Sequence, residues 1–243
     1  MTSTIPTTTS AQKIRVSAVD PGHVNPAAWI GTLHFDTNKI ETDWGVAGAD
    51  ITDVAAETRA SSLKGSKGGP TICEVGAQVG QLIVSKCEEM GIDDLEGIVV
   101  ETPSTFNGKG AFVNVGAAVG AGATYGYLCG HGVRNVRMSH SRTKSKAMEY
   151  FAEHLGITLE QHVPGTDKAA KAKNRLINKR NAKKVITELL KFSDDAKGAA
   201  LLERHHDKKD DIADAILLAC GLGLDMQPKR RVSVKGKKKK KST

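Results

Sequence analysis

The alternation of hydrophobic and polar positions predicts a sheet in the first part of the chain and helices after it. Five short apolar runs have the length and composition of strands, and they lie at residues 14–20, 27–35, 39–44, 97–101 and 133–138. The first three are separated only by short polar segments, which predicts an antiparallel meander. Their order relative to the helical segments predicts an α/β fold with a mixed five-stranded sheet flanked by helices.

Helical spacing of apolar positions marks the segments between and after these runs. Thr71 and Glu74 have the spacing of a capping box, and the helix behind them is expected to end near Met90. The Gly- and Ala-rich segment 111–130 is predicted as a helix packed closely on the sheet, although its glycines disfavour a regular helix. Three further helices are expected at residues 143–155, 169–191 and 210–224.

The chain ends differ in composition from the part between them. Residues 1–12 are rich in Thr and Ser and are predicted to be a disordered leader with no secretory signal. Residues 13–226 are predicted to form one domain, with a polar loop at about 48–70. Residues 227–243 carry a run of lysines and are predicted to be a disordered basic tail, which would add sequence-independent DNA affinity or act as a nuclear-import signal.

Composition restricts the class of protein. Aromatic residues make up 4% of the 243 residues and hydrophobic residues 39%, so the core must be aliphatic. There is no apolar run of membrane-spanning length, and no membrane association is expected. The four cysteines, Cys73, Cys87, Cys129 and Cys220, form no C-x-x-C pair and are expected to be buried free thiols in a reducing, intracellular compartment.

The net charge of +8 is unevenly distributed along the chain. Residues 1–133 have a balance of −6 and residues 192–228 one of −4, whereas residues 134–191 have +9 and the tail +9. The acidic blocks contain the candidate metal ligands described next. The basic blocks fit a polyanion such as DNA, although a solvated surface is an equally ordinary explanation for any single basic run.

Two acidic residues end predicted strands. Asp20 follows Val16-Ser17-Ala18-Val19, and Glu101 follows Ile98-Val99-Val100. Two more, Asp211 and Asp214, are three residues apart on one face of the last predicted helix. Carboxylates that converge repel one another unless a cation such as Mg²⁺ lies between them. The four residues therefore predict a two-metal site for phosphodiester hydrolysis.

Each part of this pattern has a simpler explanation. Asp20-Pro21-Gly22 is also a common turn, Glu101 could merely leave the sheet, and acids in a first helical turn are favoured by the helix dipole. Helical phase places Asp211 and Asp214 beside the buried stripe and predicts that Asp210 points further outward.

Taken together, these segments resemble the RuvC-like Holliday junction resolvases, in particular their poxviral and mitochondrial branch. The similar segments are residues 19–27, which read VDPGHVNPA, residues 98–101, which read IVVE, and residues 208–215, which read KKDDIADA. The resemblance implies a ribonuclease H-like fold and a homodimer that resolves four-way DNA junctions in recombination and repair. It also implies that Asp20, Glu101, Asp211 and Asp214 are catalytic and bind two Mg²⁺ ions, with Mn²⁺ as a substitute.

Basic residues in two segments are predicted to contact the phosphates of a branched DNA. They are Arg137, Arg142, Lys144, Lys173, Arg175, Lys179, Arg180, Lys183 and Lys184. His205 and His206 are candidates for positioning water or phosphate, but a surface pair is the simpler explanation. Phe106 could stack on a base, or pack in the core.

The same residues are compatible with two other functions. One is a ribonuclease H-like nuclease for RNA–DNA hybrids or flaps, and the other is a non-catalytic DNA-binding protein. A viral replication site, a nucleus or an organelle would fit all three functions equally.

Overall fold

The computed structural model describes residues 13–20, 26–48, 71–93, 95–102, 115–205 and 209–227. The predicted leader, almost all of the 48–70 loop and the tail from residue 228 lie outside these ranges. The strands and helices are β1 Lys13–Asp20, β2 Ala27–His34, β3 Lys39–Ala47, α2 Ile72–Glu89, β4 Leu95–Glu101, α3 Val115–Gly130, β5 Val136–Ser139, α4 Arg142–His154, α5 Lys168–Ser193, α6 Ala196–Arg204 and α7 Lys209–Met226.

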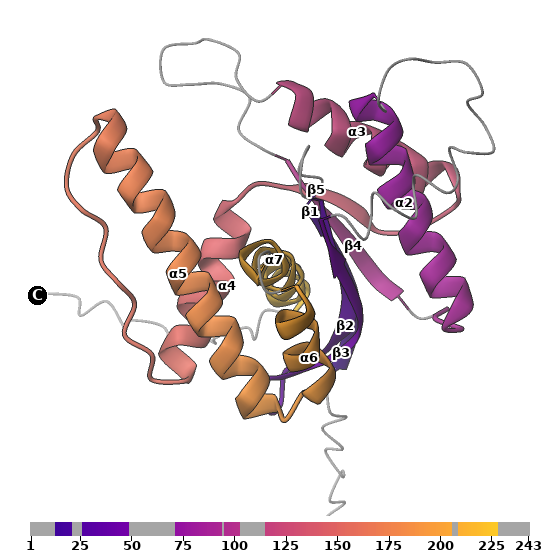
Figure 1. Cartoon of the computed structure of the whole chain (residues 1–243). Coiled ribbons are helices and arrows are strands. Elements are labelled where there is room, and N and C mark those ends of the chain that lie inside the picture. The colour runs from indigo at the N-terminus through magenta and orange to yellow at the C-terminus, as the bar shows by residue number, and fades with distance from the viewer. Residues whose placement is uncertain are drawn as a thin grey trace, which may run out of the picture.

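The five strands form one sheet in the order β3-β2-β1-β4-β5 (Figure 1). The pairs β1–β2 and β2–β3 are antiparallel, whereas β1–β4 and β4–β5 are parallel. The first three strands are the predicted meander, and β1 lies in the centre. The predicted α/β fold with a mixed five-stranded sheet flanked by helices is confirmed.

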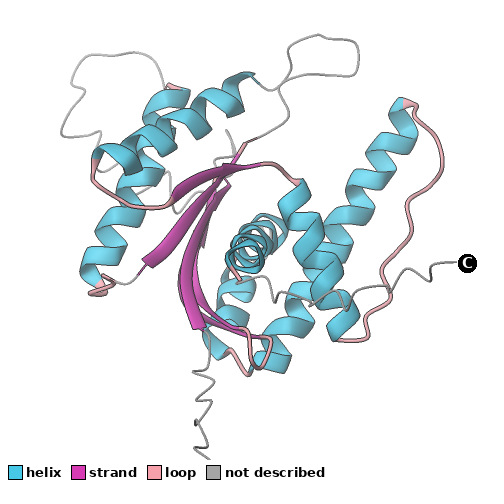
Figure 2. Ribbon diagram, turned by 180° about the vertical axis from the view of Figure 1, so that it is seen from behind, coloured by secondary structure: helices cyan, strands magenta, loops and turns pink. Residues whose placement is uncertain are grey.

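Helices cover both faces of the sheet, as Figures 1 and 2 show from opposite sides. Successive side chains of a strand point to opposite faces. Val16 and Ala18 accordingly pack with residues of α4, α5, α6 and α7, while Val19 packs on the other face with residues of α2 and α3. The sequence pattern of β1 therefore determines which helices each of its side chains meets.

Helix α7 is the central helix of its layer. Its residues from Ile212 to Gly223 are buried apart from Asp214, which is half-buried. A helix that is apolar all round must be surrounded by other elements, and α7 lies between the sheet and helices α4 and α5 (Figure 1). Within the described residues, no helix is long and apolar enough to cross a membrane.

Helix α6 was not expected from the sequence. It begins after Asp195, whose side chain accepts a hydrogen bond from the Gly198 amide at 2.9 Å. The other carboxylate oxygen of Asp195 accepts from the amide of Thr42 in β3 at 2.8 Å. One buried carboxylate thus caps the helix and attaches it to the sheet.

The glycine-rich segment is a regular helix over the described residues 115–130, and its close packing partner is α2 rather than the sheet. A Cβ atom on Gly76 of α2 would lie 2.3 Å from the carbonyl oxygen of Gly120 in α3. Thr124 of α3 also donates a hydrogen bond to the Gly76 carbonyl at 2.8 Å. The small residues therefore serve helix–helix contact. The predicted capping box at Thr71 and Glu74 is confirmed.

All four cysteines are free, as predicted, but the prediction that all are buried is wrong. Cys220 is buried, Cys87 is half-buried, and Cys73 and Cys129 are exposed. Cys73 lies in the first turn of α2, and Cys129 lies in the last turn of α3. Burial raises the pKa of Cys87 to about 11.

Candidate active site

The two strand-end acids lie side by side because β1 and β4 are adjacent and parallel. Val19 of β1 is paired with Val100 of β4, and an acidic residue follows each of them. Asp20 shares the face of Ala18, and Glu101 that of Val99, both of which pack in the cluster containing α7. Strand direction and the alternation of side chains together place both carboxylates at the C-terminal ends of β1 and β4, on the face of the sheet that α7 covers.

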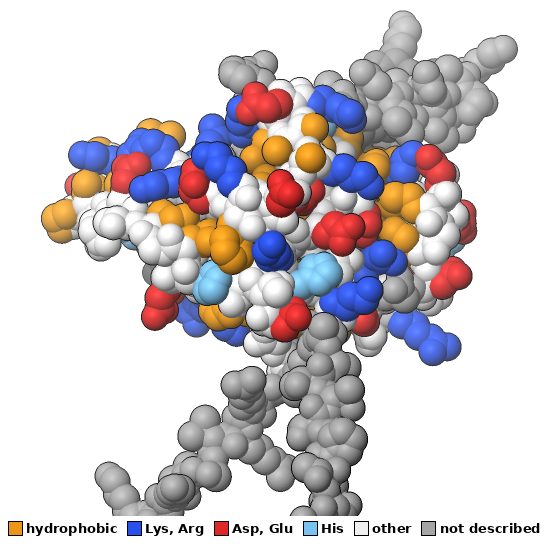
Figure 3. Space-filling model, turned by 90° about the horizontal axis from the view of Figure 1, so that it is seen from below, with side chains coloured by type: hydrophobic (Ala, Val, Ile, Leu, Met, Phe, Trp, Pro, Cys, Tyr) orange, Lys and Arg blue, Asp and Glu red, His pale blue; other side chains and the backbone are white. Residues whose placement is uncertain are grey.

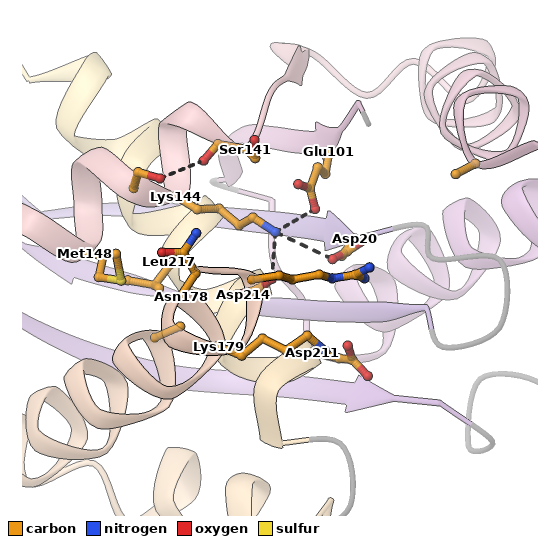
Figure 4. A pocket seen from close by; sticks show the side chains of 14 residues that line it. Asp20, Glu101, Ser141, Lys144, Met148, Asn178, Lys179, Asp211, Asp214 and Leu217 are labelled. Carbon is orange, nitrogen blue, oxygen red and sulfur yellow. Dashed lines mark hydrogen bonds and ion pairs between the residues drawn. The ribbon is translucent and has the colours of Figure 1, made fainter. Parts of the chain in front are cut away.

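Helix α7 brings its two acids to the same place. Asp211 and Asp214 line a cavity of about 550 Å³ together with Asp20 and Glu101. Figure 4 shows Asp20, Glu101 and Asp214 pointing toward one another from the ends of β1 and β4 and from α7, whereas the carboxylate of Asp211 lies apart from these three. The rest of the lining consists of Ala117, Ser141, Lys144, Ser145, Met148, Arg175, Asn178, Lys179, Ala182 and Leu217.

Lys144 of α4 extends into the centre of this acidic group (Figure 4). Its Nζ atom lies 2.8 Å from Asp214 Oδ2 and 2.9 Å from Glu101 Oε2. Asp20 Oδ2 is 3.8 Å away, within ion-pair distance. The Lys144 side chain is only 14% exposed. Lys144, which the sequence predicts as a DNA-contacting residue, is therefore the counter-ion of three of the four acids, a role that the sequence does not indicate.

The electrostatics of the site follow from burial and crowding. Burial, together with the negative charge of Glu101, raises the pKa of Asp20 well above its ordinary value. Burial also raises the pKa of Asp214, although the nearby Lys144 opposes the shift. Burial would lower the pKa of Lys144, but the three carboxylates outweigh it and raise that pKa above its ordinary value. The acids are therefore costly to ionise together unless a cation lies between them.

Two contacts fix the position of α4, and with it Lys144. The end of β5 is paired with the end of β4, so that Ser139 lies opposite Glu101. The carbonyl oxygen of Ser139 accepts a hydrogen bond from the Thr102 amide at 2.7 Å. Ser139 also hydrogen-bonds Thr143 at the start of α4. On the other side, Gly221 of α7 is so close to Thr143 that a Cβ atom would lie 2.6 Å from the Thr143 carbonyl oxygen.

We expect Gly221→Ala to destabilise the protein by about 2 kcal/mol, because the added methyl group overlaps backbone that cannot rotate away. The matched control is Gly122→Ala in α3, where a Cβ would meet no atom within 4 Å. That substitution should stabilise the protein by about 0.5 kcal/mol through helix propensity. Urea unfolding measures both, and equal effects of the two variants would contradict the close α4–α7 contact.

The neighbouring acid Asp210 does not point outward, which corrects the prediction from helical phase. Its side chain is 16% exposed and forms an ion pair with Lys179 of α5. Burial would raise the pKa of Asp210, but the hydrogen bond from Lys179 lowers it below its ordinary value. The first turn of α7 thus faces α5 as well as the cavity, since α5 packs along it.

The other predicted DNA-contacting residues are distributed over several surfaces. Arg175 and Lys179 line the cavity. Arg180 instead pairs with Glu160 at 2.6 Å, and Lys184 donates to the Thr158 carbonyl oxygen at 3.0 Å. The remaining four are exposed, namely Arg137, Arg142, Lys173 and Lys183.

Two histidines and one phenylalanine were further candidates for the site. His205 ends α6 and is only 7% exposed, so the simpler explanation of a surface pair is wrong for this residue. His206 and Phe106 lie outside the described residues.

The donor set of the site suits a hard divalent cation. Its side chains offer carboxylate oxygens, the ligands that Mg²⁺ and Mn²⁺ prefer. Among the described residues, no group of three or more His, Cys, Asp and Glu side chains is already assembled as a metal site. Three of the carboxylates converge on the ammonium group of Lys144 instead. The acid cluster therefore forms a site that attracts a cation, and the ammonium group of Lys144 supplies the positive charge in it.

No protein-family model matches the chain, and no curated protein matches its sequence. Among solved structures, RuvC of Thermus thermophilus in complex with a Holliday junction substrate is similar, with a TM-score of 0.48, 11% identity and coverage of 86% of this chain and 92% of that one. Another Thermus thermophilus RuvC structure has a TM-score of 0.38, 15% identity and coverage of 70% and 96%. A Ppx/GppA protein of Aquifex aeolicus has a TM-score of 0.31, 11% identity and coverage of 88% and 89%. At such low identities, the chain's own residues must carry the functional argument.

Proposed function

We propose that this protein is a metal-dependent endonuclease that resolves four-way DNA junctions by paired, symmetric nicks. The observation that carries the proposal is the convergence of Asp20, Glu101 and Asp214 on one cationic group, in a cavity that Asp211 also lines. An acidic cluster alone would repel DNA. Here Arg175 lines the same cavity and supplies positive charge that attracts phosphate, whereas the charge of Lys179, which also lines the cavity, is compensated by Asp210.

The residues divide the work by their chemistry. The four carboxylates, Asp20, Glu101, Asp211 and Asp214, would hold two Mg²⁺ ions, which when bound activate water and stabilise the leaving oxygen. Arg175 and Lys179 orient the phosphodiester at the mouth of the cavity. Lys144 compensates the charge of the acids when no metal is bound, so that the fold tolerates the cluster. No side chain acts as a nucleophile.

The proposal includes the setting in which the chemistry takes place. Two symmetric nicks require two active sites, and we therefore propose a homodimer on branched DNA inside a cell. The basic tail adds sequence-independent affinity for DNA.

The deciding experiment offers the purified full chain four labelled substrates with Mg²⁺, namely a mobile four-way junction, a flap, an RNA–DNA hybrid and a linear duplex. We expect symmetric nicks in the junction, no cleavage in EDTA, and loss of cleavage in Asp20→Asn. Preferential cutting of the hybrid or the flap would replace junction resolution with another nuclease function. Tight DNA binding with no cleavage of any substrate would show a non-catalytic DNA-binding protein.

A further inference from the structure

Helix α5 extends well beyond the sheet at its N-terminal end, and an extended segment runs alongside it (Figure 1). This strap consists of residues 157–167, which contain no helix or strand. Asparagine side chains of α5 hold its backbone. Asn181 donates to the Glu160 carbonyl at 3.0 Å and accepts from the Glu160 amide at 2.9 Å. Asn174 does the same with Val163, at 3.1 and 2.8 Å.

The strap also engages basic residues of α5. Arg180 makes a two-pronged contact with the carboxylate of Glu160, at 2.8 and 2.6 Å. Lys184 donates to the Thr158 carbonyl oxygen. Arg180 and Lys184, which the sequence predicts as DNA-contacting residues, therefore bind the strap of the protein itself.

A different face of α5 meets the cavity. Arg175 and Lys179 line it, and helical geometry extends their face toward the N-terminus of the helix. At 3.6 residues per turn, four basic residues fall within an arc of about 80°, and they are Lys168, Lys171, Arg175 and Lys179. Lys173 and Lys184 lie roughly 160° or more around the helix from Arg175.

The outer part of this basic ridge, as we call these four residues, is open to solvent. Lys168 and Lys171 are exposed, and within the described part of the chain neither forms an ion pair. By contrast, the face of the molecule seen from below in Figure 3 shows acidic and basic side chains next to one another, with no field of one sign. Lys179, at the inner end of the ridge, pairs with Asp210, so the positive charge of the ridge lies mainly on Lys168, Lys171 and Arg175.

We propose that the basic ridge is a phosphate-binding track that guides one DNA strand away from the cleaved phosphodiester. The proposal rests on the proposed function, since DNA must already lie in the cavity. Residues 168 to 179 span about 16 Å at a rise of 1.5 Å per residue, which equals the rise of roughly five nucleotides along the axis of a duplex at 3.4 Å each. At the outer end of the track the N-terminus of α5 is capped by the Asp167 carboxylate, so the lysine side chains carry the attraction.

The test compares Lys168→Gln/Lys171→Gln with the matched control Lys146→Gln/Lys191→Gln, which removes the same charge from two exposed lysines away from the ridge. Affinity for a fluorescent four-way junction and for a linear duplex is measured in EDTA at several salt concentrations. Loss of two phosphate contacts should reduce the slope of log affinity against log salt by about 1.8. The control should leave the slope within about 0.3 of the wild-type value.

Equal slopes for the two double variants, or no change in either, would overturn the track. Because binding in EDTA requires no cleavage, failure of the nuclease assignment is a separate outcome. A protein that cuts no substrate but shows the ridge-specific change in slope would keep the track and lose the nuclease. A protein that resolves junctions with an unchanged slope would keep the nuclease and lose the track.

Discussion

Replacing Asp214 by Asn should reduce junction cleavage by about 10³-fold or more, because a lost metal ligand removes several kcal/mol of transition-state stabilisation. Junction affinity should change by less than about threefold, since phosphate contacts, not the acids, position the DNA. Asn is nearly isosteric with Asp and still accepts a hydrogen bond from Lys144, so the fold should persist. Single-turnover cleavage in Mg²⁺ and binding in EDTA give the two values.

The matched control is Asp225→Asn, which removes the same charge near the other end of α7. Asp225 pairs with Lys146 on the surface and is 47% exposed. Its substitution should leave cleavage within about twofold, as for other surface ion pairs. Asp20→Asn and Glu101→Gln should behave like Asp214→Asn. If Asp214→Asn retained wild-type cleavage, the acid cluster would not be the catalytic centre.

Replacing Lys144 by Met should destabilise the metal-free protein by roughly 2 kcal/mol. Removal of one partner leaves three carboxylates facing one another with no counter-ion, and the partial exposure of the group moderates the cost. Mg²⁺ should stabilise this variant more than the wild type, because the metal then supplies the missing charge. Urea unfolding in EDTA and in Mg²⁺ measures both effects.

Two further variants test whether Lys144→Met loses stability because the acids lose their counter-ion. Lys146→Met, a surface lysine on the same helix that is 54% exposed, should cost less than about 0.5 kcal/mol. The double variant Lys144→Met/Asp214→Asn should lose clearly less stability than the two single losses added together, since one of the uncompensated charges is then absent. Strict additivity, or a Lys144→Met protein as stable as the wild type in EDTA, would show that Lys144 does not neutralise the acids.

Local patterns were sufficient for most of the secondary structure. Alternation identified all five strands, and Thr71 with Glu74 marked the start of α2, because capping and periodicity depend on neighbours in sequence. Helix α6 was not predicted, and the contact that attaches it to the sheet is not local. Its N-cap Asp195, which accepts a hydrogen bond from the Gly198 amide, is a local signal, but the contact of Asp195 with Thr42 joins residues that lie 153 positions apart and cannot be predicted from neighbours.

The candidate acids were also accessible from sequence, since two of them end apolar runs and two share a helix face. Their pairing with Lys144 was not. Lys144 is 43 residues from Glu101 and 70 from Asp214, and nothing about its neighbours separates it from the exposed Arg142. The inward position of Asp210 depended in the same way on Lys179 of another helix.

By itself, the sequence determined the kind of element that each segment forms and the chemistry of the side chains that those elements carry. Backbone periodicity and residue type are properties of short segments, and they need no partner. Only the tertiary structure decided which charges meet, which face of α5 the strap occupies and which face reaches the cavity. Those outcomes depend on the packing of α4, α5 and α7 over one sheet, and packing joins residues that the chain keeps far apart.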